Sequence, residues 1–398
     1  MKMSCYSDNK YKRFLMKKIA KISRRDDMNI DTVAGGSFII DTNTGAFGVF
    51  DDRGILVNSS LQYRGKTAQF IPKFYVPDDY MDCDAVFLGN AYPHFGHFLL
   101  EHLNRGWGIA QINSKNIKYV LVDNQNMGAK QWMIEFLKLA GVPEKDILIL
   151  NKSMRFNKIY IPSQSLNIVS GWYGNEFKDV FDIMRKNANT NTAYDKVYVS
   201  RAKLNDDMRV WGEEKVQHIF EKNGFKVIYP ETMPLNQQIA IISHAKVLAG
   251  CAGTALHLAL TMRDGTHVIQ LNRTSAIKDN GEIQYRLCMI KNQNIDIISA
   301  STEEFQSTHG GFHAPQIIGV NKYLKQFFDE NNFKYDDEDL MVDGDALTEY
   351  RMRLDEFKAN NGGQFYIKFK KKFIKYVSCV VPGRVRRSKF RKWLKEKM

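Results

Sequence analysis

The densest group of proton-transferring side chains lies in residues 94–107, which read His-Phe-Gly-His-Phe-Leu-Leu-Glu-His-Leu-Asn-Arg-Gly-Trp. If a helix begins near His94, then His97, Glu101 and Asn104 share one face, since side chains three or four residues apart are neighbours. A Glu one turn after a His fixes the imidazole tautomer and stabilises the imidazolium, so this spacing suits a general base. Two alternatives stay open: a histidine hydrogen-bonded in the core, and a zinc pair formed by His94 and His97.

A glycine-rich turn forms the second group. Residues 247–257 read Val-Leu-Ala-Gly-Cys-Ala-Gly-Thr-Ala-Leu-His, which predicts an apolar strand that passes through Gly250 and Gly253 into a helix. Glycines let the backbone approach a ligand, and the first amides, with the Thr254 hydroxyl, can donate to a diphosphate at the positive helix end. The turn lacks the lysine of a P-loop and the third glycine of the dinucleotide fingerprint, which disfavours an ATPase or a dehydrogenase. A tight turn without a ligand is the alternative.

Two arginines follow another predicted strand. Residues 197–201 read Val-Tyr-Val-Ser-Arg, and Arg209 comes eight residues after Arg201. The planar guanidinium group suits phosphate recognition. The sequence therefore predicts that both arginines contact the same anion as the glycine-rich turn, and the alternative is that both are solvated surface residues.

Alternating apolar runs predict the elements that would position these groups. Strands are expected at Asp84–Leu88, Ile117–Val122, Ile147–Leu150, Lys158–Ile161, Lys196–Ser200, Lys226–Tyr229, Lys246–Ala249 and His267–Leu271. Helical patterns near 95–112, 128–140, 212–223, 234–244 and 253–262 separate them. Short β-rich runs joined by helices favour parallel sheets covered on both faces. The predicted fold class is α/β, with two doubly wound Rossmann-like domains.

The same pattern predicts five segments. These are a basic amphipathic N-terminal segment (1–25), an N-terminal Rossmann-like acceptor domain with a β-rich lead-in (26–190), a C-terminal Rossmann-like donor domain (191–300), a helical segment (301–365) and a basic amphipathic tail (366–398). The boundary between the two domains falls in the polar stretch Lys186–Asp195, where Asn and Thr replace the apolar pattern.

Composition restricts the class of protein. The chain has 398 residues, of which 44% are hydrophobic and 25% charged, values typical of a folded protein and not of disordered, collagen-like or coiled-coil chains. Its longest uncharged apolar stretch, Val247–Met262, is shorter than the ~18 to 20 residues of a membrane span. We find no secretory signal pattern, and the five scattered cysteines favour reduced thiols. We therefore expect a cytoplasmic protein.

The net charge of +13 is concentrated at the two ends. Residues 366–398 hold thirteen Lys or Arg and the single acid Glu396, and residues 1–25 hold nine Lys or Arg and the single acid Asp8. The region between them is net acidic, which disfavours a nucleic-acid enzyme whose positive groove is built into the fold.

The basic ends also carry apolar residues at helical spacing. In the tail these include Phe369, Phe373, Phe390 and Trp393. Basic amphipathic helices with aromatic anchors bind the headgroup region of anionic membranes. We therefore expect peripheral attachment to the inner face of the cell membrane, and the alternative is that these helices pack on the body of the protein or on a second subunit.

Four motifs in order resemble glycosyltransferase family 61. They are Gly96-His97-Phe-Leu-Leu-Glu101 with Arg105 and Trp107, Tyr198-Val-Ser-Arg201 with Arg209, Gly224-Phe225-Lys-Val227-Ile-Tyr-Pro230-Glu231 with Gln238, and the turn Gly250 to Leu256. The resemblance covers roughly residues 84–275. The turn departs from the family, which usually has Gly-Pro-His-Gly-Ala where this chain has Gly-Cys-Ala-Gly-Thr, so the role of that histidine does not transfer. Gly212 also stands where Asn commonly precedes the acidic residue, which leaves the donor open.

The resemblance implies a two-domain GT-B fold and an inverting transfer from a nucleotide sugar without a metal or other cofactor. Bacterial relatives look like enzymes of capsular polysaccharide or lipopolysaccharide biosynthesis. We expect a UDP-sugar donor, a glycan or lipid-linked glycan acceptor, an anionic membrane surface as partner, no nucleic acid, and a homo-oligomer as one option. The alternative is a non-catalytic, membrane-associated scaffold of polysaccharide assembly with a degenerate nucleotide-sugar fold.

Site residues follow from the motifs and the resemblance together. The expected catalytic residues are His97 and Glu101, and the expected acceptor-binding residues are His94 and Arg105. The expected donor-binding residues are Arg201, Arg209, Glu231, Gly250, Gly253 and Thr254. We expect no metal site, since the adjacent acids Asp206 and Asp207 lack the Asp-x-Asp pattern.

Overall fold

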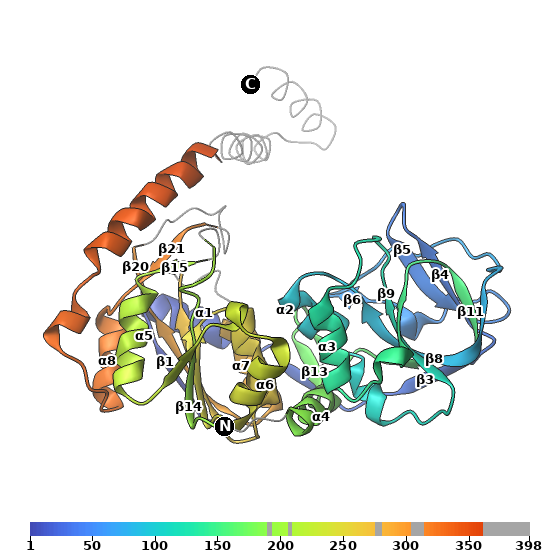
Figure 1. The fold of residues 1–398 in the computed structure, drawn as a ribbon, viewed down its shortest axis with the longest axis horizontal. Helices are drawn as coiled ribbons and strands as arrows, with labels where there is room; N and C mark the ends of the chain where they lie inside the picture. The colour runs from blue at the N-terminus through green and yellow to red at the C-terminus, as the bar shows by residue number, and fades with distance from the viewer. Residues whose placement is uncertain (189–192, 206–208, 275–280, 304–313, 361–398) are drawn as a thin grey trace, which may run out of the picture.

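The computed structural model describes residues 1–188, 193–205, 209–274, 281–303 and 314–360. It is a mixed α/β fold with two main sheets (Figure 1). The basic tail 366–398 and the acids Asp206 and Asp207 lie outside the described residues. Within the described ranges, no helix combines the length and the hydropathy that a bilayer span requires.

The first sheet has seven strands and carries the first motif. Its order is β10 (Ile147–Leu150), β9 (Ile117–Val122), β8 (Tyr80–Asn90), β11 (Met154–Pro162), β4 (Ser37–Asp41) and β5 (Ala46–Phe50), and β3 (Ile30–Ala34) also pairs with β11. The pairs among β10, β9, β8 and β11 are parallel, whereas β3, β4 and β5 are antiparallel to their neighbours. The expected Rossmann-like sheet is therefore a mixed sheet.

Aromatic side chains join the antiparallel strands to the parallel ones in one core. The rings of Phe38 and Phe47, from β4 and β5, make edge contacts to Phe87 of β8 with centroids 5.6 and 6.0 Å apart. All three rings are buried in one apolar cluster with residues of β9 and β11. The segment predicted as a β-rich lead-in thus shares one apolar core with the parallel strands. The alternation of apolar and polar residues did not predict this shared core.

The second sheet has six strands, all parallel. Its order is β16 (Lys226–Ile228), β14 (Lys196–Val199), β17 (Val247–Cys251), β18 (His267–Asn272), β19 (Asn294–Ser299) and β1 (Met3–Tyr6). The chain runs from β14 outward to β16 and then returns to β17 on the other side of β14. The order of strands therefore reverses between β14 and β17, and α/β proteins bind ligands at the carboxyl ends of strands at such a point.

The remaining elements cover these sheets. The helices are α1 (Asn9–Ile19), α2 (Phe95–His97), α3 (Gln131–Leu139), α4 (Asp179–Asn187), α5 (Glu213–Lys222), α6 (Leu235–His244), α7 (Gly281–Ile290) and α8 (Lys322–Glu330), with a further helix at 344–360. Small sheets join β2 (Ser23–Arg25), β12 (Leu166–Asn167) and β13 (Trp172–Gly174), then β15 (Val210–Trp211), β20 (Ser301–Glu303) and β21 (Gln316–Ile318), then β6 (Tyr63–Arg64) and β7 (Thr67–Ala68).

Most predicted elements match, and two predicted segments need correction. The N-terminal segment is not separate, because β1 extends the second sheet and α1 packs on α7 with Tyr11 and Leu15 buried. The Tyr11 hydroxyl accepts a hydrogen bond from Asn272 at 2.7 Å. The apolar side of α1 is thus covered by the protein itself, as in the alternative in which the basic helices pack on the body of the protein. The segment 301–365, predicted as helical, includes strands β20 and β21 beside its helices.

The first half of the structure contains the seven-stranded sheet with α2, α3 and α4, and the second half contains the six-stranded sheet with α1 and α5 to α8. The two halves meet through helices (Figure 1). Here α3 and α4 contact α6, and α2 and α4 contact the 3-10 helix η7 (Thr254–Thr261). The fully buried Lys291 amine binds Asp182 of α4 at 2.7 Å and Asp264 at 2.8 Å. A buried cation held by carboxylates from both sides favours one relative placement of the halves.

Candidate active site

The first motif begins directly after β8 and forms a short, irregular helical stretch instead of the regular helix predicted near 95–112. It comprises α2, a π-helical turn η2 (Phe98–His102) and a 3-10 turn η3 (Gly106–Ala110). π-Helical turns inside helices are frequent at functional sites because they redirect side chains. Gly89, with φ of +134°, permits this arrangement, since a Cβ there would lie 1.9 Å from the carbonyl oxygen of His102.

The predicted pair of His97 and Glu101 forms in the structure. Nδ1 of His97 is hydrogen-bonded to Oε2 of Glu101, and Oε1 of the same carboxylate binds Nε of Arg64 at 3.0 Å. Burial disfavours the ionised form of Glu101, but the His97 hydrogen bond and the Arg64 charge outweigh it, so the pKa of Glu101 is lowered. Glu101 is thus an anion at neutral pH and holds His97 with Nδ1 engaged, which leaves Nε2 as the ring atom able to accept a proton.

A cavity of about 440 Å³ opens beside this pair. Its lining includes five side-chain amides and two aromatic rings: Gln62, Gln69, Asn90, Asn124, Gln125, Phe47 and Tyr92. His97, Glu101 and Arg64 also line it. Amides that donate and accept, next to aromatic faces, provide the contacts that a polyhydroxylated ligand needs.

The other residues of the first motif differ in role. His94 is exposed and caps α2, with its ring 4.6 Å from that of His97. The His102 side chain is largely withdrawn from solvent, and this desolvation lowers its pKa to about 4, so its imidazole is neutral at pH 7. In the described part of the chain, no three His, Cys, Asp or Glu side chains are grouped as metal ligands.

Arg105 corrects an expectation. It was predicted to contact the acceptor, but its side chain is 0% exposed. Its guanidinium donates hydrogen bonds to the carbonyl oxygens of Leu61, at 2.9 Å, and Pro162, and it lies 5.0 Å from the ring centre of Phe87. Burial lowers its pKa to about 9. Arg105 therefore holds the core of the first half together and does not reach a ligand.

The glycine-rich turn and the Val197–Arg201 motif meet at the point where the second sheet reverses its strand order. Gly250 and Gly253 allow close packing there, since a Cβ on Gly250 would lie 2.6 Å from the Val199 carbonyl oxygen, and one on Gly253 would lie 3.0 Å from Nη1 of Arg201. The Arg201 guanidinium therefore lies against the turn at Gly253 that leads into η7, whose first residue is Thr254. The helix predicted at 253–262 is a 3-10 helix.

Arg209 and Glu231 lie farther from this turn along the chain and have different surroundings. Arg209 is bound to Glu214 at 2.7 Å and to Glu349 of the C-terminal helix at 3.6 Å. Glu231 is exposed in the turn that follows β16, and the Gln238 side chain fixes this turn by donating to the carbonyl oxygen of Pro230 at 2.7 Å. Arg209 thus has carboxylate partners in this structure, and Glu231 lies at the carboxyl end of the sheet.

Two residues near Arg201 were missed by the sequence analysis. Arg273 follows β18 and is buried, and its charge acts on the Cys251 thiol together with that of Arg201. Glu213, the first residue of α5, is 0% exposed and accepts a hydrogen bond from the Arg201 amide at 2.9 Å. Each residue follows a strand or turn that the sequence predicts, so its position in the fold could be predicted. The inward direction of its side chain could not.

The motif that contains His97 and the glycine-rich turn are in contact where the two halves meet. A Cβ on Gly96 would lie 2.3 Å from Cγ2 of Thr254, so the turn that carries His97 contacts the turn that carries Gly253. The His97–Glu101 pair and the Arg201 side chain therefore belong to turns that meet at the same interface.

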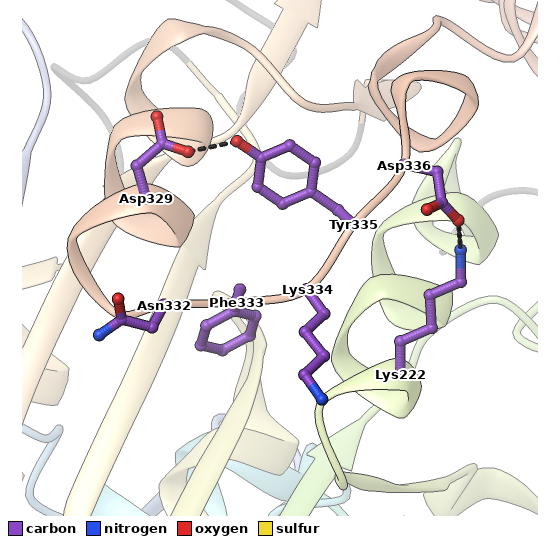
Figure 2. A pocket seen from close by; sticks show the side chains of 7 residues that line it. All are labelled: Lys222, Asp329, Asn332, Phe333, Lys334, Tyr335 and Asp336. Carbon is purple, nitrogen blue, oxygen red and sulfur yellow. Dashed lines mark hydrogen bonds and ion pairs between the residues drawn. The ribbon is translucent and has the colours of Figure 1, made fainter.

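A larger hollow of about 700 Å³ lies elsewhere, between α5 and the segment after α8 (Figure 2). Its two carboxylates have partners in the lining: Lys222 binds Asp336 at 2.6 Å, and the Tyr335 hydroxyl donates to Asp329. It contains none of the motif residues, so we assign the site to the interface of the halves.

The contact between the halves predicts a specific rescue. Gly96→Ala should weaken nucleotide binding and lower the midpoint of thermal unfolding, because the new methyl group clashes with Thr254 Cγ2. Thr254→Ser removes that methyl group and keeps the hydroxyl. The double variant Gly96→Ala/Thr254→Ser should therefore recover most of the loss, as measured by differential scanning fluorimetry and calorimetric titration. Additive losses in the double variant would contradict this contact.

Comparisons with known proteins agree with the geometry at the level of family. No curated protein matches the chain. One solved structure that it resembles is the bacterial iron-containing dodecameric glycosyltransferase TibC from enterotoxigenic E. coli H10407, at 10% identity and a TM-score of 0.24, covering 63% of this chain and 79% of that one. The sequence model of Glycosyltransferase 61 matches residues 95–269, a range that holds all four motifs. This match over residues 95–269 confirms the resemblance to glycosyltransferase family 61 that was drawn from the motifs.

Proposed function

We propose that the protein is an inverting glycosyltransferase that moves a sugar from a nucleotide-sugar donor to a growing surface glycan of the capsule or lipopolysaccharide type. The family match supports glycosyl transfer. The observation that carries the proposal is the contact of Gly96 with Thr254, which joins a His–Glu pair to a cationic turn. We propose a GT-B arrangement, with the acceptor over the first half and the donor over the second.

In this proposal His97 is the general base. Glu101 holds Nδ1 of His97, so Nε2 accepts the proton of the acceptor hydroxyl as its oxygen attacks the anomeric carbon. The bond from that carbon to the diphosphate breaks on the opposite face, and the configuration inverts. The pair Glu101–His97 resembles other carboxylate–imidazole pairs in which the acid orients the base and stabilises its cation.

The departing nucleoside diphosphate needs positive charge. We propose that Arg201, the first amides of η7 and the Thr254 hydroxyl supply it, with Arg273 nearby and Gly250 and Gly253 providing space. These groups would make the transfer metal-independent. Arg209 would contribute after release from Glu214 or Glu349, and Glu231 would bind the ribose or the sugar. We favour a UDP-sugar donor.

The acceptor would occupy the cavity beside His97. Its amide and aromatic lining suits the hydroxyl groups and apolar faces of a glycan. His94, exposed next to His97, would contact the acceptor, whereas Arg105 is excluded by its burial. A homo-oligomer remains part of the proposal.

A non-catalytic scaffold is the second candidate. It is favoured by the departure of the glycine-rich turn from the family, since Cys251-Ala252 stands where Pro-His is usual. Consumption of a nucleotide sugar separates the two candidates, because a scaffold binds nucleotide without turning it over.

The first prediction of this proposal concerns the donor. UDP-, GDP-, CDP- and CMP-linked sugars should differ in the thermal shift they cause, and the best ligand should stabilise the protein and be consumed when a glycan acceptor is added. Arg201→Ala should weaken its binding at least tenfold, since a charge-assisted contact is lost. Lys226→Ala, an exposed cation on β16, serves as the matched control and should bind normally. Binding without turnover would favour the scaffold.

The second prediction concerns the base. His97→Ala should lower kcat by about 10² to 10⁴ with nucleotide affinity within a few fold of wild type, because the base acts in the transition state. Glu101→Gln should lose less, since it removes the support and not the proton acceptor. Equal activity of His97→Ala and wild type would remove His97 from the mechanism, and an active His97→Ala beside an inactive Glu101→Gln would reverse the two roles.

The third prediction concerns location. We propose that residues 366–398 bind the anionic inner surface of the cell membrane through their cations and aromatic residues. A protein truncated after Gln364 should still bind nucleotide but should no longer co-sediment with vesicles containing phosphatidylglycerol. Salt should weaken the binding of the full chain without abolishing it, since apolar burial is not screened. Equal sedimentation of both proteins would disprove attachment by the tail, and unfolding on truncation would favour a packed tail.

A further inference from the structure

Glu213 joins three elements of the second half at one point. Its Oε1 accepts a hydrogen bond from the Tyr198 hydroxyl of β14 at 3.0 Å, and its Oε2 accepts one from the Arg201 amide at 2.9 Å. The Cys251 thiol at the end of β17 is a third partner. The buried carboxyl therefore ties the start of α5 to the ends of the two strands between which the order reverses.

We propose that Glu213 takes up a proton when a nucleoside diphosphate binds beside Arg201, so that this carboxyl couples donor affinity to pH. The inference rests on the proposed function, because it takes the donor diphosphate to lie between Arg201 and the turn at Gly253. It assigns Glu213 a positioning role, since the carboxyl acts on the ligand through the Arg201 backbone and through its charge.

Glu213 is the member of this cluster suited to change its charge near neutral pH. Burial raises the pKa of Glu213 from 4.5 to about 7, although the bonds from the Arg201 amide, Cys251 and Tyr198 act in the opposite direction. Burial also raises the pKa of Tyr198 and of Cys251 well above their usual values, so the phenol and the thiol stay protonated between pH 6 and 9.

The charges around the carboxyl set the direction of the coupling. The Arg201 backbone amide donates to this carboxyl, and the charges of Arg201 and of Arg273, which follows β18, both act on the adjoining Cys251 thiol. An ionised Glu213 is attracted by these cations, and a bound diphosphate competes for them and repels the carboxylate. Because charges interact strongly in a buried setting, the ligand raises the pKa of Glu213 further.

The proton balance is simple. A proton from solvent adds to Oε1, which then donates to the oxygen of Tyr198; the Tyr198 hydroxyl turns its own hydrogen to its other partner, the Cys251 sulfur, and Oε2 continues to accept from the Arg201 amide. No bond to the ligand changes in this step. By linkage, uptake of a proton on binding means that affinity falls as pH rises through the range in which free Glu213 ionises.

Calorimetric titration of the full-length protein tests the inference. The probe is whichever of UDP-glucose, GDP-mannose and CDP-glucose gives the largest thermal shift. A nucleotide sugar is used because its sugar-capped diphosphate has no proton that titrates near neutral pH. Titrations at pH 7.5 in phosphate, HEPES and Tris, which differ in ionisation enthalpy, give the number of protons exchanged. For a one-unit rise in the pKa of Glu213, we expect uptake of roughly half a proton and an affinity about sixfold lower at pH 8.5 than at pH 6.5.

Variants assign the proton to Glu213. Glu213→Gln keeps the shape, with the amide oxygen accepting from the Arg201 amide and the amide nitrogen donating to Tyr198, but it cannot titrate. It should bind the probe with no proton uptake and a flat pH profile. Glu221→Gln, at an exposed position of the same helix, is the matched control and should behave as wild type.

Each outcome decides between the two proposals. Binding by wild type without proton uptake, or unchanged uptake in Glu213→Gln, overturns the role of Glu213 and leaves the donor site in place. A Glu213→Gln variant that does not fold is replaced by Tyr198→Phe, which removes a hydrogen bond that lowers the pKa of Glu213; more of the carboxyl is then protonated before the ligand binds, and the uptake should be smaller. Failure of wild type to bind any of the three nucleotide sugars overturns the proposed function and this inference with it.

Discussion

The close approach of Gly96 to Thr254 is the constraint on which the site depends. At 2.3 Å from a Cβ, no larger residue fits at position 96 without a shift of the turn or of η7. The contact lies beside the packing of α4 on η7 and the buried Lys291, whose carboxylate partners come from both halves. Because these interactions act together, they favour one relative position of the His97 turn and the Arg201 turn, and the mechanism proposed above needs both halves.

Buried charge is distributed unequally between the halves. In the first half, Arg105 is fully buried, and carbonyl oxygens and the Phe87 ring compensate its charge in part. In the second half, Glu213 is equally buried, and its partners are a phenol, a thiol and one amide. Neutral partners satisfy hydrogen bonds but do not neutralise a charge, which is why both groups have pKa values displaced toward their neutral forms.

The sequence predicted what local pattern determines. Ile117–Val122 and Ile147–Leu150 were bounded correctly, because continuous β-rich runs have few alternatives, and the His97–Glu101 pair followed from helical spacing. Pairing of Met3–Tyr6 with β19 joins residues about 290 positions apart, a relation that no local pattern encodes. The inward direction of Arg105 was missed for another reason, since a charged residue in a motif suggests a ligand and only the packed core reveals its carbonyl partners.

Two glutamates in contrasting surroundings separate the functions of the two halves. Glu101 keeps a lowered pKa because the His97 hydrogen bond and the Arg64 charge outweigh its burial, so it is ionised at neutral pH. Glu213 has no comparable compensation, and its pKa of about 7 makes its charge change within the working range. The same residue type therefore gives a constant support for proton transfer on one side of the interface and a variable charge on the other. In the mechanism proposed above, it follows that donor binding depends on pH through Glu213 in the second half, whereas in the first half Glu101 gives His97 a support of constant charge.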